Sequence, residues 1–115
     1  YENDYYHQVS KDIERIPGNP WFVCTLWLAA WHARRAEARA GTDRALRYLD
    51  WATRRARPSG VMAEQVHPET GDPLSVSPLT WSHAAYVSAV ATVARKLQEL
   101  DRKTAPEGAK ADGVT

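Results

Sequence analysis

The sequence of 115 residues predicts an all-helical fold, and three observations support that class. A stretch at 21–40, apolar in its first half, and an amphipathic stretch at 80–102 each have the composition or spacing of a long helix. A shorter helix is expected at 42–57, because Gly41 precedes this stretch and Pro58 follows it closely. The residues between the second and third helices, 59–79, are rich in Gly and Pro and show no helical period. We therefore expect three helices and one long loop.

The first helix has an expected cap and an unusual composition. Asn19 is a favoured N-cap residue, and Pro20 at the first helical position costs no hydrogen bond. The residues from 21 to 31 are apolar on every side, which is typical of a helix inside a large protein. We interpret Trp27 and Trp31 as core residues and Cys24 as an inert core thiol. The second half, 32–39, turns polar and should reach a surface.

The other two helices each carry one apolar stripe. The second has Thr42 as its expected N-cap and Asp43 in its first turn, where a negative charge suits the helix dipole. Trp51 lies off its stripe and is expected to pack on a neighbour. The stripe of the second helix consists of Ala45, Leu46, Leu49 and Ala52. The stripe of the third helix, which starts near Thr80, consists of Tyr86, Val90, Val93, Leu97 and Leu100.

The remaining segments are expected to be irregular. Residues 1–18 read as a polar loop with room for one helical turn at 11–15, and the composition of 105–115 predicts a disordered tail. The loop at 59–79 is longer than compact domains usually contain without a functional reason. A functional site is therefore expected on that loop.

Composition and charge narrow the classes of function. The net charge of +1 gives no argument for a polyanionic partner. The apolar run at 21–31 is shorter than the roughly twenty residues of a membrane span. The four His residues and Cys24 have no metal-ligand spacing, so we expect no metal and no cofactor. Eight arginines between 34 and 57 follow no single face, and we interpret them as a solvated surface. A non-catalytic helical interaction module or nucleic-acid-binding module remains the alternative function.

Three strings of residues stand in a fixed order along the chain. The first is Tyr1-Glu2-Asn3-Asp4-Tyr5-Tyr6, and the second is Gly18-Asn19-Pro20-Trp21-Phe22-Val23-Cys24-Thr25-Leu26. The third combines Met62-Ala63-Glu64-Gln65 with His67-Pro68-Glu69-Thr70-Gly71-Asp72-Pro73-Leu74-Ser75 and Leu79-Thr80-Trp81-Ser82-His83-Ala84. Together they resemble segments of the family 15 glycoside hydrolases, the glucoamylase-like enzymes. The match departs from the family in two places: 7–16 is longer than in fungal members, and Met62-Ala63 replaces a Leu-Pro pair common in bacterial members.

The resemblance implies a fold and a reaction. The helices would be the C-terminal part of an (α/α)6 six-hairpin barrel, also described as a toroid. The activity would be inverting hydrolysis of α-glucosidic bonds, with an oligosaccharide or disaccharide such as an α-glucan or trehalose as substrate. The resemblance assigns the water-activating general base to Glu64. The two carboxyl groups of an inverting enzyme are about 6.5–9.5 Å apart, and no segment here resembles the motif of the general acid.

The resemblance also supplies candidate sugar-binding residues. Trp21 and Trp81 match positions that line the glucose-binding pocket, although an isolated Trp at a helix start would be read as core. Tyr5 and Tyr6 could contribute hydroxyl groups or simply pack in their loop. Gln65 could orient Glu64 or be exposed. Glu69 and Asp72 share the loop but are interpreted as turn residues, in Pro68-Glu69-Thr70-Gly71-Asp72-Pro73.

The organisation expected from these features is that of a C-terminal segment. Residues 1–104 would belong to the catalytic domain, and the missing N-terminal part of the same domain would be the main partner. No nucleic-acid or membrane partner is expected. A cytoplasmic location is expected, with secretion left open, and the α-1,4, α-1,6 or trehalose linkage is not specified by these residues.

Overall fold

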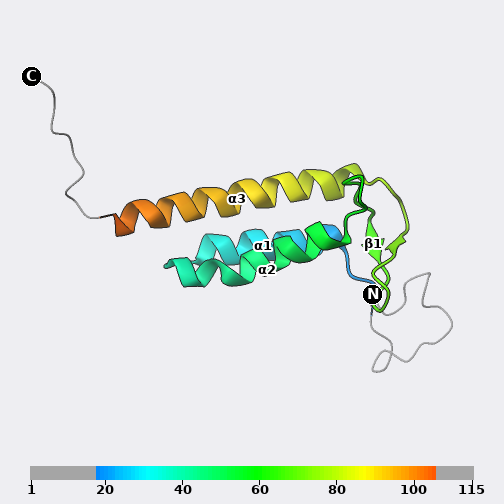
Figure 1. Ribbon diagram of the computed structural model, residues 1–115, viewed down its shortest axis with the longest axis horizontal. Helices are drawn as coiled ribbons and strands as arrows, with labels where there is room; N and C mark the ends of the chain where they lie inside the picture. The colour runs from blue at the N-terminus through cyan, green and yellow to red at the C-terminus, as the bar shows by residue number, and fades with distance from the viewer. Residues whose placement is uncertain (1–17, 106–115) are drawn as a thin grey trace, which may run out of the picture.

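The computed structural model describes residues 18–105, which form three packed helices with an irregular segment at one end (Figure 1). The helices are α1 (Phe22–Arg35), α2 (Asp43–Arg55) and α3 (Thr80–Thr104), and a short 3-10 helix η2 (Arg39–Thr42) precedes α2. A hairpin of two-residue strands, β1 (Gln65–Val66) and β2 (Pro73–Leu74), interrupts the irregular segment. The helical class is confirmed, while the hairpin was not predicted. The predicted loop at 1–18 with its turn, and the predicted tail at 105–115, lie outside the described residues except for 18 and 105.

The start of α1 differs from the predicted cap. Trp21, not Asn19, is the N-cap, and its backbone is extended with φ −102° and ψ 135°. The extension arises because this segment pairs with the hairpin: the backbone N–H of Val66 donates to the carbonyl of Pro20 at 3.0 Å, and Trp21 bridges Gln65. A long-range pairing has therefore overridden a favourable local cap.

The end of α1 also differs, since the helix stops at Arg35 instead of Ala40. Ala36 is extended, and the chain then turns through η2 into α2. Gly41 suits this turn, because a Cβ atom at that position would make a tight contact of 3.2 Å with the Cβ of Ala36. The polar second half of the predicted helix is thus a tight connection between two antiparallel helices.

The second helix is close to its prediction. It begins after Thr42, with Asp43 in its first turn as expected. The hydroxyl of Thr42 donates to the carbonyl of Arg39 and makes no capping bond to the helix. Ala45 and Ala52 are buried, but Leu46 is exposed, so the predicted stripe is narrower than expected.

The third helix begins at Thr80 as predicted and continues two residues beyond the predicted end, to Thr104. Its buried residues include Ala89 and Val93, whereas Val90 from the predicted stripe is exposed. The prediction for Val90 was wrong because α3 meets the core through the small side chain of Ala89, one position away on the helix.

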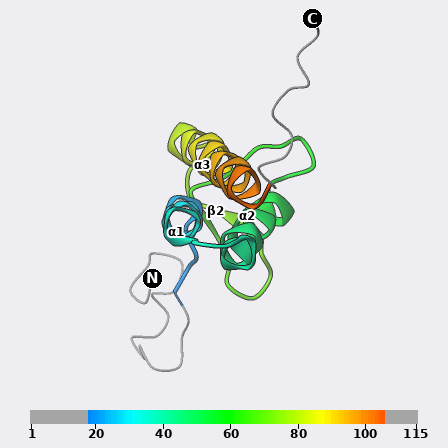
Figure 2. The same ribbon diagram turned by 90° about the vertical axis from the view of Figure 1, so that its left-hand side faces the viewer.

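The core lies where the three helices meet, and an end-on view shows them as a triangle (Figure 2). Packing between α1 and each of the other helices is more extensive than packing between α2 and α3. Phe22 is fully buried and its ring centroid lies 5.5 Å from that of Trp51, which confirms that Trp51 packs on a neighbouring helix. The central cluster comprises Phe22, Leu26, Ala29, Ala52, Met62, Ala63, Val66 and Ala89.

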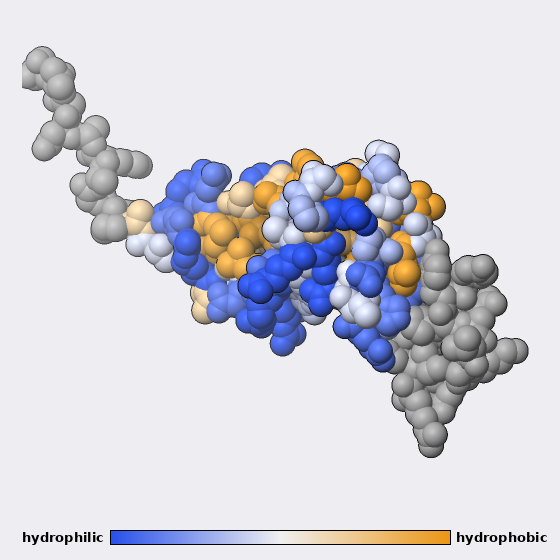
Figure 3. Space-filling model, turned by 45° about the vertical axis from the view of Figure 1, so that its right-hand side comes forward, coloured by the Kyte–Doolittle hydropathy of each residue, from blue (hydrophilic) through white to orange (hydrophobic). Residues whose placement is uncertain are grey.

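One side of α1 is not covered by the other helices. Trp27 and Trp31, predicted as core, are exposed, and so is Cys24. The core prediction is wrong for these residues within the described part of the chain, because α2 and α3 enclose only the opposite side of α1. Hydrophobic side chains accordingly reach the surface among charged ones (Figure 3). None of the helices within residues 18–105 combines the length and hydropathy needed to traverse a bilayer.

Candidate active site

The backbone of Glu64 is fixed from two directions. Its carbonyl accepts a hydrogen bond at 3.2 Å from the N–H of Phe22, the first residue of α1. Its own N–H donates to the carbonyl of Val76 at 2.9 Å, beyond β2. Glu64 is therefore joined both to a helix N-terminus and to the far side of the hairpin. This limits the movement of the carboxylate.

The carboxylate itself is held by two donors at one oxygen. Oε2 of Glu64 accepts a hydrogen bond from Nε2 of Gln65 at 3.0 Å and another from the hydroxyl of Ser75. Among residues 18–105, no group donates to Oε1, and the side chain is only half-buried. One oxygen is thus anchored while the other can accept a proton or bind water. A carboxylate with one oxygen held and the other accessible suits a general base.

Gln65 connects the carboxylate to the start of α1. Its side chain is buried, and its Oε1 accepts a hydrogen bond from Nδ2 of Asn19 at 3.1 Å. Because an amide can donate and accept at once, the contact with Asn19 fixes which end of Gln65 faces Glu64. Of the two interpretations of Gln65, the structure shows the buried, orienting arrangement. Asn19 therefore contacts Gln65 instead of capping α1 as expected.

Ser75 was missed as a site residue by sequence reasoning. It follows β2 with φ at +65°, a left-handed conformation that is uncommon for residues other than Gly. In this conformation its hydroxyl reaches Glu64, eleven residues earlier in the chain. The only signal in the sequence is a polar residue after a Gly- and Pro-rich turn, and that signal does not specify the register of the hairpin.

The N-terminal turn of α3 holds the residues before Glu64. The hydroxyl of Ser82 donates to the carbonyl of Ala63 at 2.7 Å, and the N–H of Met62 donates to Nε2 of His83 at 3.0 Å. The N–H of Leu79 donates to the carbonyl of Met62 at 3.0 Å. Ser82 and His83 belong to the third string of residues, and the sequence alone predicts no role for them. The start of α3 therefore fixes the position of the residues that precede Glu64.

The turn between the strands contains several hydrogen bonds among its own residues. The N–H of His67 donates to the carbonyl of Asp72, and the Asp72 carboxylate accepts a hydrogen bond from the hydroxyl of Thr70. Nδ1 of His67 accepts from the N–H groups of Glu69 and Thr70, each at 3.2 Å. Asp72 is thus used within the turn, and Glu69 is exposed. Both observations agree with the interpretation of these two carboxylates as turn residues.

The candidate aromatic residues lie at two helix starts. Trp21 is half-buried at the N-cap of α1, next to the Phe22–Glu64 contact. Trp81 is 52% exposed in the first turn of α3 and meets Trp27 edge to face, with ring centroids 5.8 Å apart. Tyr5 and Tyr6 lie outside the described residues. The structure thus gathers Trp21 with Glu64 and Gln65, whereas Trp81 faces α1.

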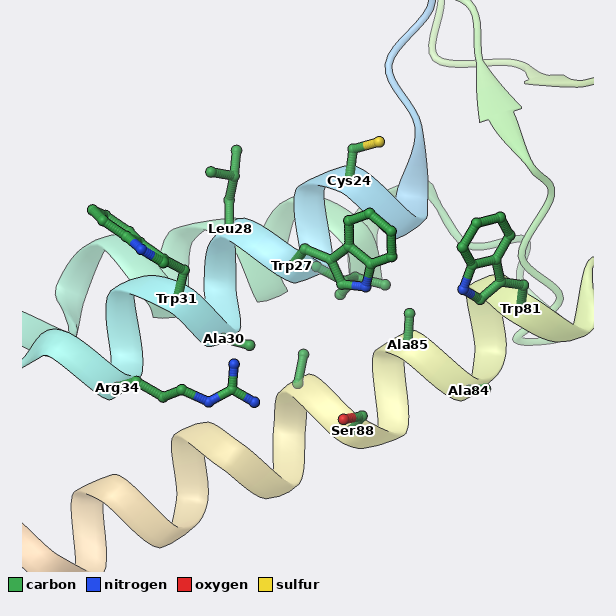
Figure 4. A pocket seen from close by; sticks show the side chains of 12 residues that line it. Cys24, Trp27, Leu28, Ala30, Trp31, Arg34, Trp81, Ala84, Ala85 and Ser88 are labelled. Carbon is green, nitrogen blue, oxygen red and sulfur yellow. The ribbon is translucent and has the colours of Figure 1, made fainter.

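Trp81 lies at one end of a groove of about 890 Å³ between α1 and α3 (Figure 4). Neither Glu64 nor Trp21 lines this groove. The carboxylate and the groove are neighbouring but separate features, connected through the N-terminal turn of α3. As for metal ligands, residues 18–105 bring together no group of three or more His, Cys, Asp or Glu side chains.

Comparison with known proteins places these features in a family. The model of the family described as glycosyl hydrolases family 15 matches residues 1–91. A curated relative is an uncharacterized glycosyl hydrolase of Methanocaldococcus jannaschii, 32% identical over an alignment that covers 61% of this chain. The aligned part is 13% of the length of that relative. No solved structure gives a significant match.

Proposed function

The chain belongs to glycosyl hydrolases family 15, and on that premise we propose that Glu64 is the general base of an inverting hydrolase of α-glucosidic bonds. The observation that carries the proposal is the asymmetric holding of the carboxylate. Gln65 and Ser75 both donate to Oε2, and no described residue donates to Oε1. A base needs an oxygen that is aimed but unoccupied.

The proposed reaction uses water as the nucleophile. Oε1 of Glu64 accepts a proton from a water molecule as the water oxygen attacks the anomeric carbon of the sugar. A carboxylic acid on the opposite side protonates the glycosidic oxygen, and the bond between that oxygen and the anomeric carbon breaks. Attack from the face opposite the leaving group inverts the anomeric configuration. Glu64 ends the step protonated and returns its proton to solvent.

The acid is proposed to come from a part of the catalytic domain outside these 115 residues. The chain spans 13% of the length of the matched relative, so such a protein has ample further sequence to supply it. In the proposed arrangement α1, α2 and α3 are helices of an (α/α)6 barrel, and the missing N-terminal part of the domain completes it.

The sugar ring is proposed to contact Trp21, Trp81 and Gln65, with Tyr5 and Tyr6 from the N-terminal loop. Trp21 and Gln65 support this by their position beside Glu64, and Trp81 by its exposure in the first turn of α3. The indole faces would cover the apolar face of a pyranose ring. An α-glucan or trehalose is the proposed substrate class.

The alternative of a nucleic-acid-binding module gains no support from the arginine side chains. Several of them contact neighbours on the same chain: Arg54 pairs with Asp50 at 2.7 Å, Arg39 pairs with Asp101, and the Arg55 guanidinium lies 4.6 Å from the ring centroid of Trp51. Each of these three arginines is thus engaged by a neighbouring side chain of the same chain.

The test is Glu64→Gln in the full catalytic domain, compared with Glu69→Gln in the exposed turn of the same loop. Glu64→Gln should lower kcat by about 10²–10⁴, the usual contribution of a general base, while KM changes little. Glu69→Gln should leave kcat and KM unchanged. The assay would use maltose, isomaltose and trehalose. Activity of Glu64→Gln within a few-fold of the parent on the best substrate would exclude Glu64 as the base.

The stereochemistry of the product tests the mechanism independently. NMR immediately after cleavage should show the inverted anomer, because water attacks directly. A retained anomer would contradict the two-carboxylate scheme with a water nucleophile. The 115 residues alone should hydrolyse none of the three substrates, since only the proposed base is among them.

A further inference from the structure

Asn19 carries a buried amide that lies directly before the first helix and does not cap it. The residue is 3% exposed, and the N-cap of α1 is Trp21. Nδ2 of Asn19 donates to Oε1 of Gln65, 46 positions further along the chain, at 3.1 Å. A polar side chain is costly to bury unless it is hydrogen-bonded. The contact between these two amides is therefore a specific feature of the fold.

The two ends of the Gln65 side chain face different partners. Gln65 is 4% exposed; its Oε1 accepts from Asn19, and its Nε2 donates to Oε2 of Glu64 at 3.0 Å. Rotation of the amide by half a turn would exchange its oxygen and its NH2 group with almost no change in shape. The amide oxygen would then face the Glu64 carboxylate, which can only accept hydrogen bonds when it is ionised. The donor on Asn19 opposes this rotation, because it pairs only with the oxygen.

Two backbone hydrogen bonds hold together the segments that carry these amides. The N–H of Val66 donates to the carbonyl of Pro20 at 3.0 Å, and the N–H of Phe22 donates to the carbonyl of Glu64 at 3.2 Å. Neither bond involves a side chain, so both remain available when the side chain of Asn19 is changed. Removal of that amide therefore acts on the orientation of its partner more than on the pairing of the two segments.

The other donor to Glu64 depends less on a neighbour for its polarity. The hydroxyl of Ser75 donates to the same carboxylate oxygen from a backbone with φ at +65°. A hydroxyl hydrogen rotates to suit its acceptor, whereas an amide fits the same space in two orientations of opposite polarity. Gln65 is therefore the donor whose orientation a neighbour must set, and Asn19 contacts it at the end remote from Glu64.

We propose that Asn19 is a positioning residue for the general base and that it acts through Gln65. The Asn19 amide selects the orientation in which Nε2 of Gln65 holds Oε2 of Glu64, and this keeps Oε1 directed at the attacking water. The proposal rests on the proposed function, in which Glu64 is that base. In this role Asn19 transfers no proton and needs no contact with the sugar. It raises the fraction of enzyme molecules in which the carboxylate is correctly aimed.

The first test is Asn19→Ala in the full catalytic domain, assayed on whichever of maltose, isomaltose and trehalose is cleaved best. The kcat should fall by about 2- to 10-fold, the size expected from the loss of one hydrogen bond. The KM should stay unchanged, because the sugar contacts proposed for Trp21 and Trp81 remain. An unchanged kcat would overturn the proposal. A raised KM would also overturn it, since the start of α1 would then have moved together with Trp21.

A double-mutant cycle tests whether the effect passes through Gln65. Gln65→Leu removes a hydrogen bond to a charged carboxylate and should lower kcat by about 10-fold or more. Once this amide is absent, Asn19 has nothing to orient. Asn19→Ala should therefore cause no further loss of kcat in the Gln65→Leu background. Equal fold-losses in the two backgrounds would show that Asn19 acts independently of Gln65, which contradicts the proposal.

Thr42→Val provides a matched control for stability. Thr42 is 1% exposed, and its hydroxyl donates to the carbonyl of Arg39 at 2.6 Å, beyond the other end of α1. Melting curves should show that Asn19→Ala and Thr42→Val both destabilise the domain, since each removes a buried hydrogen bond. Only Asn19→Ala should lower kcat. If Thr42→Val lowers kcat by the same factor, the loss follows stability and the positioning role fails.

A second substitution covers the case in which Asn19→Ala does not fold. Asn19→Leu is close to the parent side chain in size and has no donor. It should lower kcat to the same extent as expected for Asn19→Ala, and it enters the same cycle with Gln65→Leu. A kcat of Asn19→Leu equal to that of the parent would sink the idea, because a filled site without a donor would then suffice.

Comparison with Glu64→Gln separates this proposal from the catalytic one. If Glu64→Gln loses activity while Asn19→Ala keeps the parent kcat, Glu64 stands as the base and the positioning role of Asn19 fails. If Glu64→Gln keeps its activity, the assignment of the base fails, and the positioning role fails with it.

Discussion

The surroundings of Glu64 and the exposed face of α1 differ in how far residues of this chain provide their contacts. Around Glu64, local hydrogen bonds fix the geometry: Gln65 and Ser75 donate to one carboxylate oxygen, and Ser82 donates to the carbonyl of the preceding residue. Along the outer face of α1, Trp27 and Trp31 have no covering layer within the described structure. Directional hydrogen bonds can therefore organise a site locally, while the burial of indole surface depends on a larger fold.

The largest expected effect concerns the uncovered face. The isolated 115-residue chain should self-associate, because Trp27, Leu28 and Trp31 expose apolar surface of the kind that mediates association. The double substitution Trp27→Gln with Trp31→Gln should shift its mass toward the 12.9 kDa of a monomer. Leu46→Gln serves as the control on another surface. Static light scattering measures the mass, and a monodisperse parent chain with a cooperative, high-temperature melt would contradict the expectation.

A smaller effect is expected at Trp81, which borders both regions. Trp81→Ala in the full domain should weaken transition-state binding by about 1–3 kcal/mol, by analogy with other aromatic contacts. That corresponds to roughly a 5- to 150-fold loss in kcat/KM. Trp81→Phe keeps a ring and should lose less. A melting curve provides the control: if Trp81→Ala fails to fold, Trp81 is a core residue and its assignment to the sugar site is wrong.

A still smaller effect should follow from loosening the Glu64 carboxylate. Ser75→Ala removes the hydroxyl, and Ser75→Gly removes it while suiting the backbone at φ +65°. One hydrogen bond is worth about 0.5–1.5 kcal/mol, so each variant should lower kcat by about 2- to 10-fold. If only Ser75→Ala is impaired, the backbone conformation matters and the hydroxyl does not. Initial rates at saturating substrate distinguish these results.

The smallest expected effect involves His32 on α1, whose ring contacts Trp31 and also stacks on Tyr48 of α2. Partial burial beside Tyr48, with ring centroids 5.7 Å apart, lowers the pKa of His32 below its ordinary 6.5, and Arg44, Arg35 and Arg47 lower it further. The unfolded chain therefore binds a proton at higher pH than the folded chain does. This contribution to stability is present above about pH 6.5 and is lost as the pH falls.

The measurement for His32 combines NMR titration with melting. In the 115-residue chain, the His32 ring protons should titrate with a midpoint below 6.5, and His32→Gln identifies the resonance. The variant should also lose part of the decrease in melting temperature between pH 7.5 and pH 5.5. A midpoint above 6.5 would show that the neighbouring arginines do not govern this side chain.

The sequence predicted the elements better than their contacts. Helix positions followed from apolar spacing and from Gly41 and Pro58, and the ordered strings located Glu64. The role of Asn19 could not be predicted, because a favourable cap and a pairing with a residue 46 positions away compete, and only the fold decides between them. Ser75 was hidden for the same reason, since its contact depends on the register that pairs Gln65 with Leu74.

The exposed indoles illustrate a different kind of error. The all-round apolar pattern of α1 is typical of a helix inside a large protein. It does not say which neighbours provide the cover, and within residues 18–105 only one side is provided. Amino-acid pattern reports the environment in which a helix is stable, while the identity of the covering elements is a property of tertiary structure.

The closed turn at 67–72 has a practical consequence for protein engineering. His67, Thr70 and Asp72 are joined by hydrogen bonds within this turn, and Glu69 is exposed at its tip. Exposed loop tips tolerate changes of sequence. A fluorophore attached at position 69 would use this exposed side chain and leave in place the N–H groups of residues 69 and 70 that donate to His67. This position is the natural entry point for labelling the protein close to its proposed active site.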